Sequence, residues 1–375
     1  MEKHQWIATA AFGIEGIAAR ELTRMGIPAK AEAGGARFEG TLSDGLRANL
    51  WLRTADRVLL EVWSFEARSF EALFEQTRSL PWERWISGHT SFPVSGNCAR
   101  SQLMSIRDCQ SIIKKAIVER LKTKYHCNWL PEDKETVAVD FQIHQDRVRL
   151  TLDSSGVALN RRGYRTWNGE APLRETLAAA LVDLSPWRPG MPLLDPMCGT
   201  GTLLIEAALK ISHRAPGLNR SFALEGWQNM PEADFLQIRA EAQEAFDPSL
   251  VSDLHGSDIN PEVIQLAKRH LHAAGLDGRI DFQTADMRTV QRAEASGIIL
   301  CNPPYGERLG DRKSCEALYH DFGIMCCSHP AWSVCVITSH PAFERHFGRR
   351  AERKRRFYNG RLECEYMVFP AKREE

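Results

Sequence analysis

From residue 173 onward, short apolar runs alternate with helical patterns, and this alternation limits the fold more than any other feature of the chain. The runs that read as strands are MPLLDP, LHGSDI, RIDFQTAD, GIILCNPP and WSVCVITS. Strand–helix alternation is typical of a parallel sheet covered by helices on both faces. We therefore predict an α/β, Rossmann-like sheet over residues 173–375, with RKRRFYNG and CEYMVFP as an antiparallel edge hairpin around Asn359 and Gly360.

Helix boundaries in this region are marked by local signals. PEVIQLAKRHLHAAG follows Asn260, which can cap a helix, and begins with Pro261, which favours the first helical position. Gly275 marks its end. LRETLAAALVDLS and GTLLIEAALKI are predicted as two further helices.

The first part of the chain does not follow the same alternation. QWIATA and ARFEG read as strands around the helical stretch IEGIAARELTRMG, and IRDCQSIIKKAIVERLKTKY repeats Ile113, Ile117 and Leu121 at helical spacing. TVAVDFQIHQDRVRLTLDSSG alternates as a hairpin. Small α+β units are therefore predicted before the α/β sheet. The predicted divisions are residues 1–60, residues 61–155 and a linker over residues 156–172.

Length and composition exclude several classes of protein. The 375 residues exceed what one ordinary core holds, and no apolar run reaches the ~18 residues of a membrane span. Because 48 Lys+Arg balance 48 Asp+Glu, a nucleic-acid contact would have to be a local patch. The 10 cysteines form no C-x-x-C pair, so we expect buried free thiols, no metal site and a cytoplasmic protein without a secretory signal.

The first motif with chemical meaning is Asp195-Pro196-Met197-Cys198-Gly199-Thr200-Gly201-Thr202, between an apolar strand and an apolar helix. Glycines at such a turn let the backbone approach a ligand, and open α/β sheets bind ligands at this edge. Position 204 is Leu, so the dinucleotide fingerprint is incomplete. A tight turn without a ligand remains the alternative for this motif.

Two acidic residues close later strands of the same predicted sheet. Asp258 and Asp286 each follow an apolar run, and both can accept hydrogen bonds from a ribose and an adenine amino group. Asp258 lies 57 positions after Gly201, so a helical insertion at roughly 213–250 must intervene. Either aspartate alone could be only a turn or helix-capping residue.

The third motif is Asn302-Pro303-Pro304-Tyr305 at the end of the strand GIILC. Two prolines stop the strand, and the side-chain carbonyl of Asn302 and the main-chain carbonyl of Pro303 are acceptors. The Tyr305 ring can stack on a planar base whose exocyclic NH2 donates to these acceptors. The alternative is a turn that merely closes the strand.

In this order, DPMCGTGT, SDINPEVI, TADM and NPPYGERL resemble the motifs of class I S-adenosylmethionine-dependent methyltransferases that modify exocyclic amino groups. With IATAAFGIEGIAARELTRMG, LNRRGYR and APGLNRSFALEGWQ, almost the whole chain resembles the bacterial THUMP-domain RNA methyltransferases, which include the YpsC-like proteins and the N-terminal part of RlmL. The resemblance implies a class I methyltransferase sheet preceded by a ferredoxin-like part (1–60) and a THUMP RNA-binding domain (61–155).

The resemblance also implies roles for particular residues. Asn302, Pro303, Pro304 and Tyr305 would hold the target base as the catalytic motif. S-adenosyl-L-methionine would be the cofactor, and no metal is implied. The residues implied to bind the cofactor are Leu173, Thr176, Asp195, Pro196, Cys198, Gly199, Thr200, Gly201, Asp258, Ile259, Asp286, Met287 and Asn302.

Local basic clusters are candidates for RNA contact, since phosphate binding requires such positive charge. An ordinary solvated face explains each cluster equally well. The candidate residues are Lys114, Lys115, Arg161, Arg162, Arg165, Arg353, Lys354, Arg355 and Arg356.

The resemblance implies methylation of the exocyclic N2 amino group of a guanine in large-subunit (23S) ribosomal RNA or its assembly intermediate. Asn-Pro-Pro-Tyr also suits a DNA or RNA adenine-N6 methyltransferase, so that activity is the nearest alternative. A non-catalytic RNA-binding assembly factor is the alternative from another class, against which the intact glycines, Asp258 and the catalytic motif argue. The sequence predicts no oligomeric state.

Overall fold

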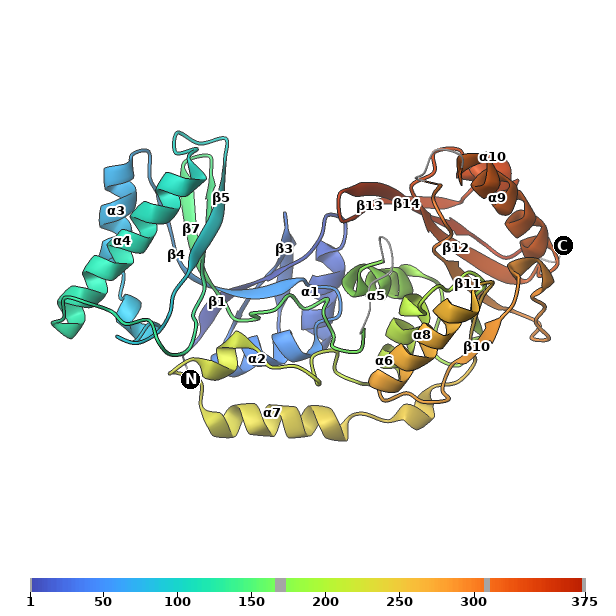
Figure 1. Cartoon of the computed structure of the whole chain (residues 1–375), viewed down its shortest axis with the longest axis horizontal. Coiled ribbons are helices and arrows are strands. Elements are labelled where there is room, and N and C mark those ends of the chain that lie inside the picture. The colour runs from blue at the N-terminus through green and yellow to red at the C-terminus, as the bar shows by residue number, and fades with distance from the viewer. Residues whose placement is uncertain (1, 166–172, 307–310, 373–375) are drawn as a thin grey trace. The chain divides into compact units, whose positions relative to one another are not determined.

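The computed structural model describes residues 2–165, 173–306 and 311–372, so part of the predicted linker, residues 166–172, lies outside the described residues. The described residues divide into two compact units, each with a seven-stranded sheet (Figure 1). The first unit contains the chain up to Ala10, Ala18–Leu159 and Arg220–Glu241. The second contains Ala11–Ile17, Asn160–Asn219 and the chain from Ala242 onward.

The sheet of the first unit runs through both predicted N-terminal parts. Its strands in spatial order are β2 (Ala29–Glu32), β3 (Gly35–Gly40), β1 (His4–Thr9), β4 (Arg57–Glu66), β7 (Arg147–Asp153), β6 (Val139–His144) and β5 (Val94–Ala99). Neighbours are antiparallel except β5 and β6. β4 pairs with β1 on one side and β7 on the other, so the predicted boundary at residue 60 falls inside this shared strand.

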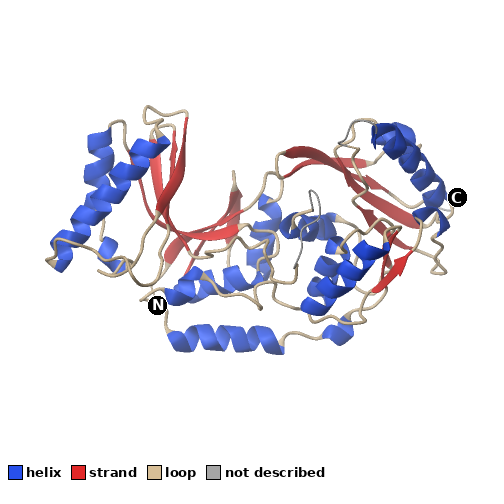
Figure 2. Ribbon diagram, viewed as in Figure 1, coloured by secondary structure: helices blue, strands red, loops and turns tan. Residues whose placement is uncertain are grey.

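Four helices of the N-terminal region accompany this sheet (Figure 2). They are α1 (Glu15–Arg24), α2 (Leu42–Trp51), α3 (Phe70–Ser79) and α4 (Ile106–Tyr125). The predicted apolar face of α4 is confirmed, because Ile113, Ile117 and Leu121 are fully buried. The sequence patterns above did not indicate α2, which begins with a capping box in which Thr41 and Asp44 bond each other's backbone N–H.

The predicted insertion between Gly201 and Asp258 is helical and contributes to the first unit. It contains α7 (Glu232–Glu244), whose Asp234 accepts a hydrogen bond from Ser43 Oγ at 2.7 Å. Before α7, the Trp227 ring meets the Trp85 ring edge-on with centroids 5.9 Å apart. The middle of the insertion, Arg220–Glu241, therefore belongs to the N-terminal sheet unit, whereas its two ends belong to the second unit.

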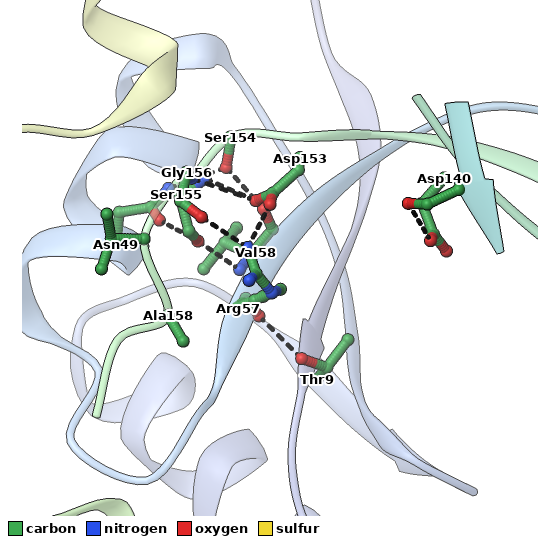
Figure 3. A network of polar contacts seen from close by, with 12 residues as sticks. Thr9, Asn49, Arg57, Val58, Asp140, Asp153, Ser154, Ser155, Gly156 and Ala158 are labelled. Atoms are coloured by element: carbon green, nitrogen blue, oxygen red, sulfur yellow. Dashed lines mark hydrogen bonds and ion pairs between the residues drawn. The ribbon is translucent and has the colours of Figure 1, made fainter. Parts of the chain in front are cut away.

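A buried polar network joins the start of β4 to the end of β7 (Figure 3). Asn49 of α2 donates to Ser154 Oγ at 2.8 Å, and Ser155 Oγ accepts from the Val58 N–H at 2.8 Å. Arg57 forms an ion pair with Asp153. Because these side chains satisfy one another, they fix the point at which the chain leaves the sheet.

Asp140 of β6, drawn in the same view, predicts a pH effect on stability. Burial raises the pKa of its carboxyl to about 6, with the Asp153 carboxylate adding to the rise. The folded state therefore favours the protonated carboxyl. Ionising Asp140 lowers the free energy of unfolding, and this loss is absent below pH ~4, where the carboxyl is protonated in both states, and complete above pH ~6. Asp140→Asn should be more stable than the wild type by about 2 kcal/mol at pH 8, and the difference should vanish at pH 4. Urea denaturation at both pH values measures this, and an equal difference at both would contradict it.

The second unit is the predicted α/β sheet. Its strands in spatial order are β10 (Asp281–Thr284), β9 (Leu254–Asp258), β8 (Leu193–Asp195), β11 (Gly297–Cys301), β12 (Trp332–Thr338), β14 (Leu362–Phe369) and β13 (Arg353–Asn359). β10 to β12 are parallel neighbours, and β13 and β14 form the predicted antiparallel edge hairpin. The strand order reverses between β8 and β11, and this is where open α/β sheets bind ligands.

Helices and a large apolar cluster support this sheet. The helices are α5 (Glu175–Leu184), α6 (Thr202–Ile211), α8 (Pro261–Ala273), α9 (Asp311–Cys327) and α10 (Phe343–Phe347). The predicted start of α8 is confirmed, because the Asn260 side chain accepts the Glu262 N–H. Tyr319 and Phe322 of α9 pack with Phe343 of α10 on the β11, β12 and β14 side of the sheet. Among the described residues, no helix combines the length and apolar character needed to cross a membrane.

Candidate functional site

A cavity of about 1110 Å³ lies at the carboxyl ends of the parallel strands of the second unit. It is large enough for a nucleotide-sized ligand together with a second group. The residues that line it are Pro196, Met197, Gly199, Asp258, Ile259, Asp286, Met287, Arg288, Asn302, Pro303, Pro304, Tyr305, Gly306, Ser314, Cys315, Leu318, Asn359, Arg361 and Leu362.

The loop between β8 and α6 forms one wall of this cavity. Gly199 and Gly201 have positive φ values of 54° and 78°, which L side chains rarely adopt. The Gly199 N–H donates to Asp258 Oδ2 at 3.0 Å, and the Cys198 N–H donates to the Ser257 carbonyl at 2.9 Å. The ends of β8 and β9 are thereby held together at the cavity.

The two glycines differ in what surrounds them, and this gives a prediction. A Cβ at Gly201 would lie 2.6 Å from the Phe282 ring, whereas one at Gly199 would meet no atom within 4 Å. Gly201→Ala should therefore cost about 3 kcal/mol of stability. Gly199→Ala should cost about 1 kcal/mol of backbone strain and weaken binding of S-adenosylhomocysteine, since the added methyl group occupies cavity space.

Gly190→Ala is the matched control for strain. Gly190 has φ 84° and open space around it, but it does not line the cavity. Thermal denaturation and titration calorimetry with S-adenosylhomocysteine separate the two effects. If Gly190→Ala weakened binding as much as Gly199→Ala, backbone strain rather than contact with the ligand would be the cause.

Asp195 and Cys198 lie beneath this wall and do not line the cavity. Asp195 is 2% exposed, and burial raises the pKa of its carboxyl to about 7. Burial also raises the pKa of the Cys198 thiol, so the thiol stays protonated and packs as an apolar group. Leu173, Thr176, Thr200 and Gly201 also lie outside the lining residues.

Asp258, Ile259, Asp286 and Met287 line the cavity from the ends of β9 and β10. The Ile259 side chain is 68% exposed, so a large apolar surface faces solvent at the edge of this cavity. Asp286 accepts the Arg288 N–H at 3.0 Å and the Arg288 guanidinium at 2.8 Å, and these hydrogen bonds lower the pKa of its carboxyl. Both aspartates therefore supply hydrogen-bond acceptors to this wall.

Asn302 to Tyr305 follow β11 and line the cavity on the other side of the point at which the strand order reverses. The Tyr305 hydroxyl donates to Asn302 Oδ1, and burial raises the pKa of that hydroxyl well above its usual range. The buried Tyr319 hydroxyl donates to the Pro304 carbonyl, which fixes the backbone of the motif. The cavity therefore presents carbonyl acceptors beside an aromatic ring.

Sequence reasoning missed part of the lining. Asn359, Arg361 and Leu362 come from the turn of the β13–β14 hairpin, and Ser314, Cys315 and Leu318 come from α9. The hairpin itself was predicted, but no local pattern indicated that its turn would reach the cavity. Among the described residues, no group of His, Cys, Asp or Glu side chains is suited to a metal ion.

Two of the predicted RNA contacts are wrong. Arg162 is 3% exposed, with its guanidinium 3.4 Å from Glu206, and the Arg165 guanidinium is paired with Glu175 at 3.3 Å. Arg165 also donates to Thr202 Oγ1 and to the Leu173 carbonyl. Both arginines are therefore internal supports of the second unit, because their charges are neutralised inside it.

The other basic candidates are distributed differently. Lys114 is paired with Glu132 at 2.8 Å, and its ammonium lies over the Phe92 ring. Lys115 and Arg161 are exposed. Arg353, Lys354, Arg355 and Arg356 are all exposed on β13, as a surface patch requires. Their contact with RNA stays a prediction.

Comparison with known proteins gives a family signature for each part of the chain. The signature described as an RlmL ferredoxin-like domain matches residues 5–59, and the THUMP domain matches residues 67–153. The signature described as the RMKL-like methyltransferase domain matches residues 162–367.

Relatives cover nearly the whole chain. YpsC of Bacillus subtilis (strain 168), a candidate RNA methyltransferase, is 41% identical over 374 residues, which are 99% of this chain and 97% of YpsC. The ribosomal RNA large subunit methyltransferase K/L of Syntrophotalea carbinolica is 33% identical over 97% of this chain. The match covers 53% of that enzyme, so this chain spans about half of its length.

Solved structures are similar over the same extent. SMU.472, a candidate methyltransferase complexed with SAH, aligns over 100% of both chains with a TM-score of 0.95 and 36% identity. A Listeria monocytogenes protein described as a predicted N6-adenine-specific DNA methylase aligns over 98% of this chain and 96% of its own, with a TM-score of 0.94 and 42% identity.

Proposed function

Because this chain belongs to the RMKL-like methyltransferases and carries a THUMP domain, it is an S-adenosylmethionine-dependent RNA methyltransferase, and we propose that it methylates the N2 amino group of a guanine in 23S ribosomal RNA. One observation carries the proposal: Asn302 and Tyr305 line the same cavity as Asp258 and Asp286. A base and a nucleoside cofactor can therefore be held side by side.

The cofactor side of the cavity fits S-adenosylmethionine chemically. Asp258 would accept hydrogen bonds from the ribose hydroxyls, Asp286 would accept one from the adenine amino group, and Ile259 and Met287 would offer apolar surface to the ring. At Gly199 the space that a Cβ would fill is open. When bound, the cofactor would supply an electrophilic methyl group to the amino nitrogen, and its sulfur would keep the electron pair of the broken C–S bond.

On the other side, the protein positions the amino group of the flipped-out guanine. Asn302 Oδ1 and the Pro303 carbonyl accept its two N–H groups, while the Tyr305 ring stacks on the base. These acceptors draw the nitrogen lone pair out of conjugation and orient it toward the methyl group. The extra proton on the methylated nitrogen leaves to water. Positioning supplies most of the acceleration, because the electrophile is already reactive.

The ribosomal substrate is supported by the relatives that act on large-subunit rRNA and by the THUMP domain. Either mature 23S rRNA or an assembly intermediate would be the partner, which agrees with a cytoplasmic site of action. Methylation of adenine N6 is the second candidate, because a structurally similar protein is described in those terms and carbonyl acceptors suit both amino groups. The THUMP domain favours RNA over DNA.

A transfer assay with radiolabelled S-adenosylmethionine tests the proposal. The substrates would be a 23S rRNA transcript, a tRNA pool and duplex DNA, each digested to nucleosides after reaction. We expect N2-methylguanosine from the 23S transcript. N6-methyladenosine as the sole product, or transfer to DNA alone, would refute the proposed base or substrate. RNA binding without any transfer would favour an assembly factor.

A further inference from the structure

An exposed aromatic pair lies on the hairpin whose turn lines the cavity. Asn359 and Arg361 line the cavity, and the residue before them on β13, Tyr358, is 37% exposed. Its ring meets that of Phe12 edge-on, with centroids 6.2 Å apart, and Phe12 is 62% exposed. Two adjacent aromatic rings left in water are unusual for a surface without a partner.

The loop that carries Phe12 is held firmly on the hairpin. Residues Ala11–Ile17 pack with the second unit, and Gly13 adopts φ 87°. A Cβ at Gly13 would lie 3.1 Å from both the Arg356 carbonyl and the Phe357 ring. A side chain at this positive φ would be strained and would also push these atoms apart, so glycine lets the backbone beside Phe12 lie against β13.

Tyr358 is also oriented. Its hydroxyl donates to Glu363, its cross-strand partner on β14, at 3.0 Å. This bond holds the ring on the hairpin, on the face opposite Asn359. The aromatic pair is therefore a fixed platform rather than two independently moving side chains.

The surroundings of the platform are basic. Arg353, Lys354, Arg355 and Arg356 are exposed on β13. Lys354 and Arg356 have acidic neighbours in Glu344 and Glu363, but such exposed pairs contribute little and exchange readily. Arg355 and Arg361 have no ion-pair partner among the residues that the structure describes. This charge suits a phosphate backbone.

From this arrangement we infer that Phe12 and Tyr358 stack a base of the single-stranded RNA next to the target nucleotide, while Arg361 contacts the adjoining phosphate. The inference rests on the proposed RNA methyltransferase function and names the site that holds the flanking strand. Stacking accepts any base because every base has a flat face, so the platform would hold the strand without choosing its sequence. Because Tyr358 and Asn359 face opposite sides of the hairpin, the RNA strand would pass around its turn to bring the target nucleotide to the cavity.

A second copy of this chain is the other occupant that an edge strand could recruit, by pairing with the open side of β13. Gly13 already lies against the Arg356 carbonyl, which obstructs such pairing at this point of the strand. Pairing with a second copy would also bring two basic strands together at this edge, and their positive charges would repel each other. RNA therefore fits the surface better than self-association.

The test compares Phe12→Ala, Tyr358→Ala and Arg361→Ala in binding to fluorescein-labelled RNA with S-adenosylhomocysteine present. The probes are a 12-nucleotide single strand of mixed sequence and the 23S rRNA transcript. Each aromatic variant should weaken binding about tenfold with no change in the salt dependence of the affinity. Arg361→Ala should reduce the slope of log K against log salt by about 0.7. Tyr358→Phe should retain wild-type affinity, since it keeps the ring.

Ile324→Ala is the matched control, because Ile324 is 59% exposed on α9 and does not line the cavity. Affinity for S-adenosylhomocysteine and thermal stability show that each variant is folded. If RNA binds the wild type and the aromatic variants equally, the platform is refuted while the proposed function stands. If the wild type binds neither probe, the proposed function itself fails. A change in sedimentation without loss of RNA affinity would assign the surface to self-association.

Discussion

Asn302→Ala should lower the rate of methyl transfer to RNA by about 10³-fold while leaving affinity for S-adenosylhomocysteine within about twofold. Asn302 Oδ1 and the Pro303 carbonyl are the acceptors placed at the end of β11, and Oδ1 is held in place by the Tyr305 hydroxyl. Removing the amide takes away an interaction that strengthens as the amino group becomes a nucleophile. Single-turnover kinetics at saturating RNA measure the chemical step directly.

Asn219→Ala provides the matched control for this variant. Asn219 is an exposed asparagine of the same unit, bonded to Arg214 and outside the cavity. Its substitution should leave the rate unchanged. Residual transfer by Asn302→Ala within tenfold of the wild type would show that this side chain does not orient the base.

Asp258→Ala should weaken binding of S-adenosylhomocysteine about 100-fold. The carboxylate would lose its hydrogen bonds to the ribose hydroxyls and also its contacts to the N–H groups of Gly199 and Asn260, both at 3.0 Å. The loop between β8 and α6 would then lose its attachment to β9. Asp258→Asn keeps an acceptor oxygen at this position and should lose less affinity.

Titration calorimetry measures both variants against Asp277→Ala. Asp277 is an exposed aspartate of the same unit, paired with His272. Its removal should not affect the ligand. Equal weakening by Asp258→Ala and Asp277→Ala would trace the effect to overall charge rather than to a contact.

The parts of the fold that were predicted are those in which local signals agree with tertiary burial. α8 has its cap, its proline and its apolar face in one segment, and the β13–β14 turn contains Asn359-Gly360. α2 lacked such a signal apart from its capping box, because the face it buries is made largely of small and polar residues, among them Ser43, Gly45 and Asn49. A hydrophobic period could not reveal a helix of that kind.

The sequence predicted those residues of the candidate site that directly follow the parallel strands. Asp258, Asp286 and Asn302 follow parallel strands, and the carboxyl ends of such strands meet at one edge of the sheet. Arg361 lines the cavity because the β13–β14 turn reaches it, and Phe12 meets Tyr358 because an N-terminal loop packs with the second unit. Such a neighbourhood is set by tertiary packing and leaves no local pattern.

The misassigned arginines show the opposite error. Arg162 and Arg165 form part of a basic segment, and basic segments are usually solvated. Their partners, Glu206 within the apolar helix α6 and Glu175 at the start of α5, are buried. A glutamate inside an apolar helical pattern was the available sign that a buried cation would meet it.

Mass mapping of modified nucleosides in 23S rRNA tests the central claim most directly. The comparison is between a wild-type strain and one that lacks this protein, with the wild-type gene and its Asn302→Ala variant restored on plasmids. The account predicts that one N2-methylguanosine disappears and returns only with the wild-type gene. An unchanged set of N2-methylguanosines, with loss of an N6-methyladenosine instead, would contradict it.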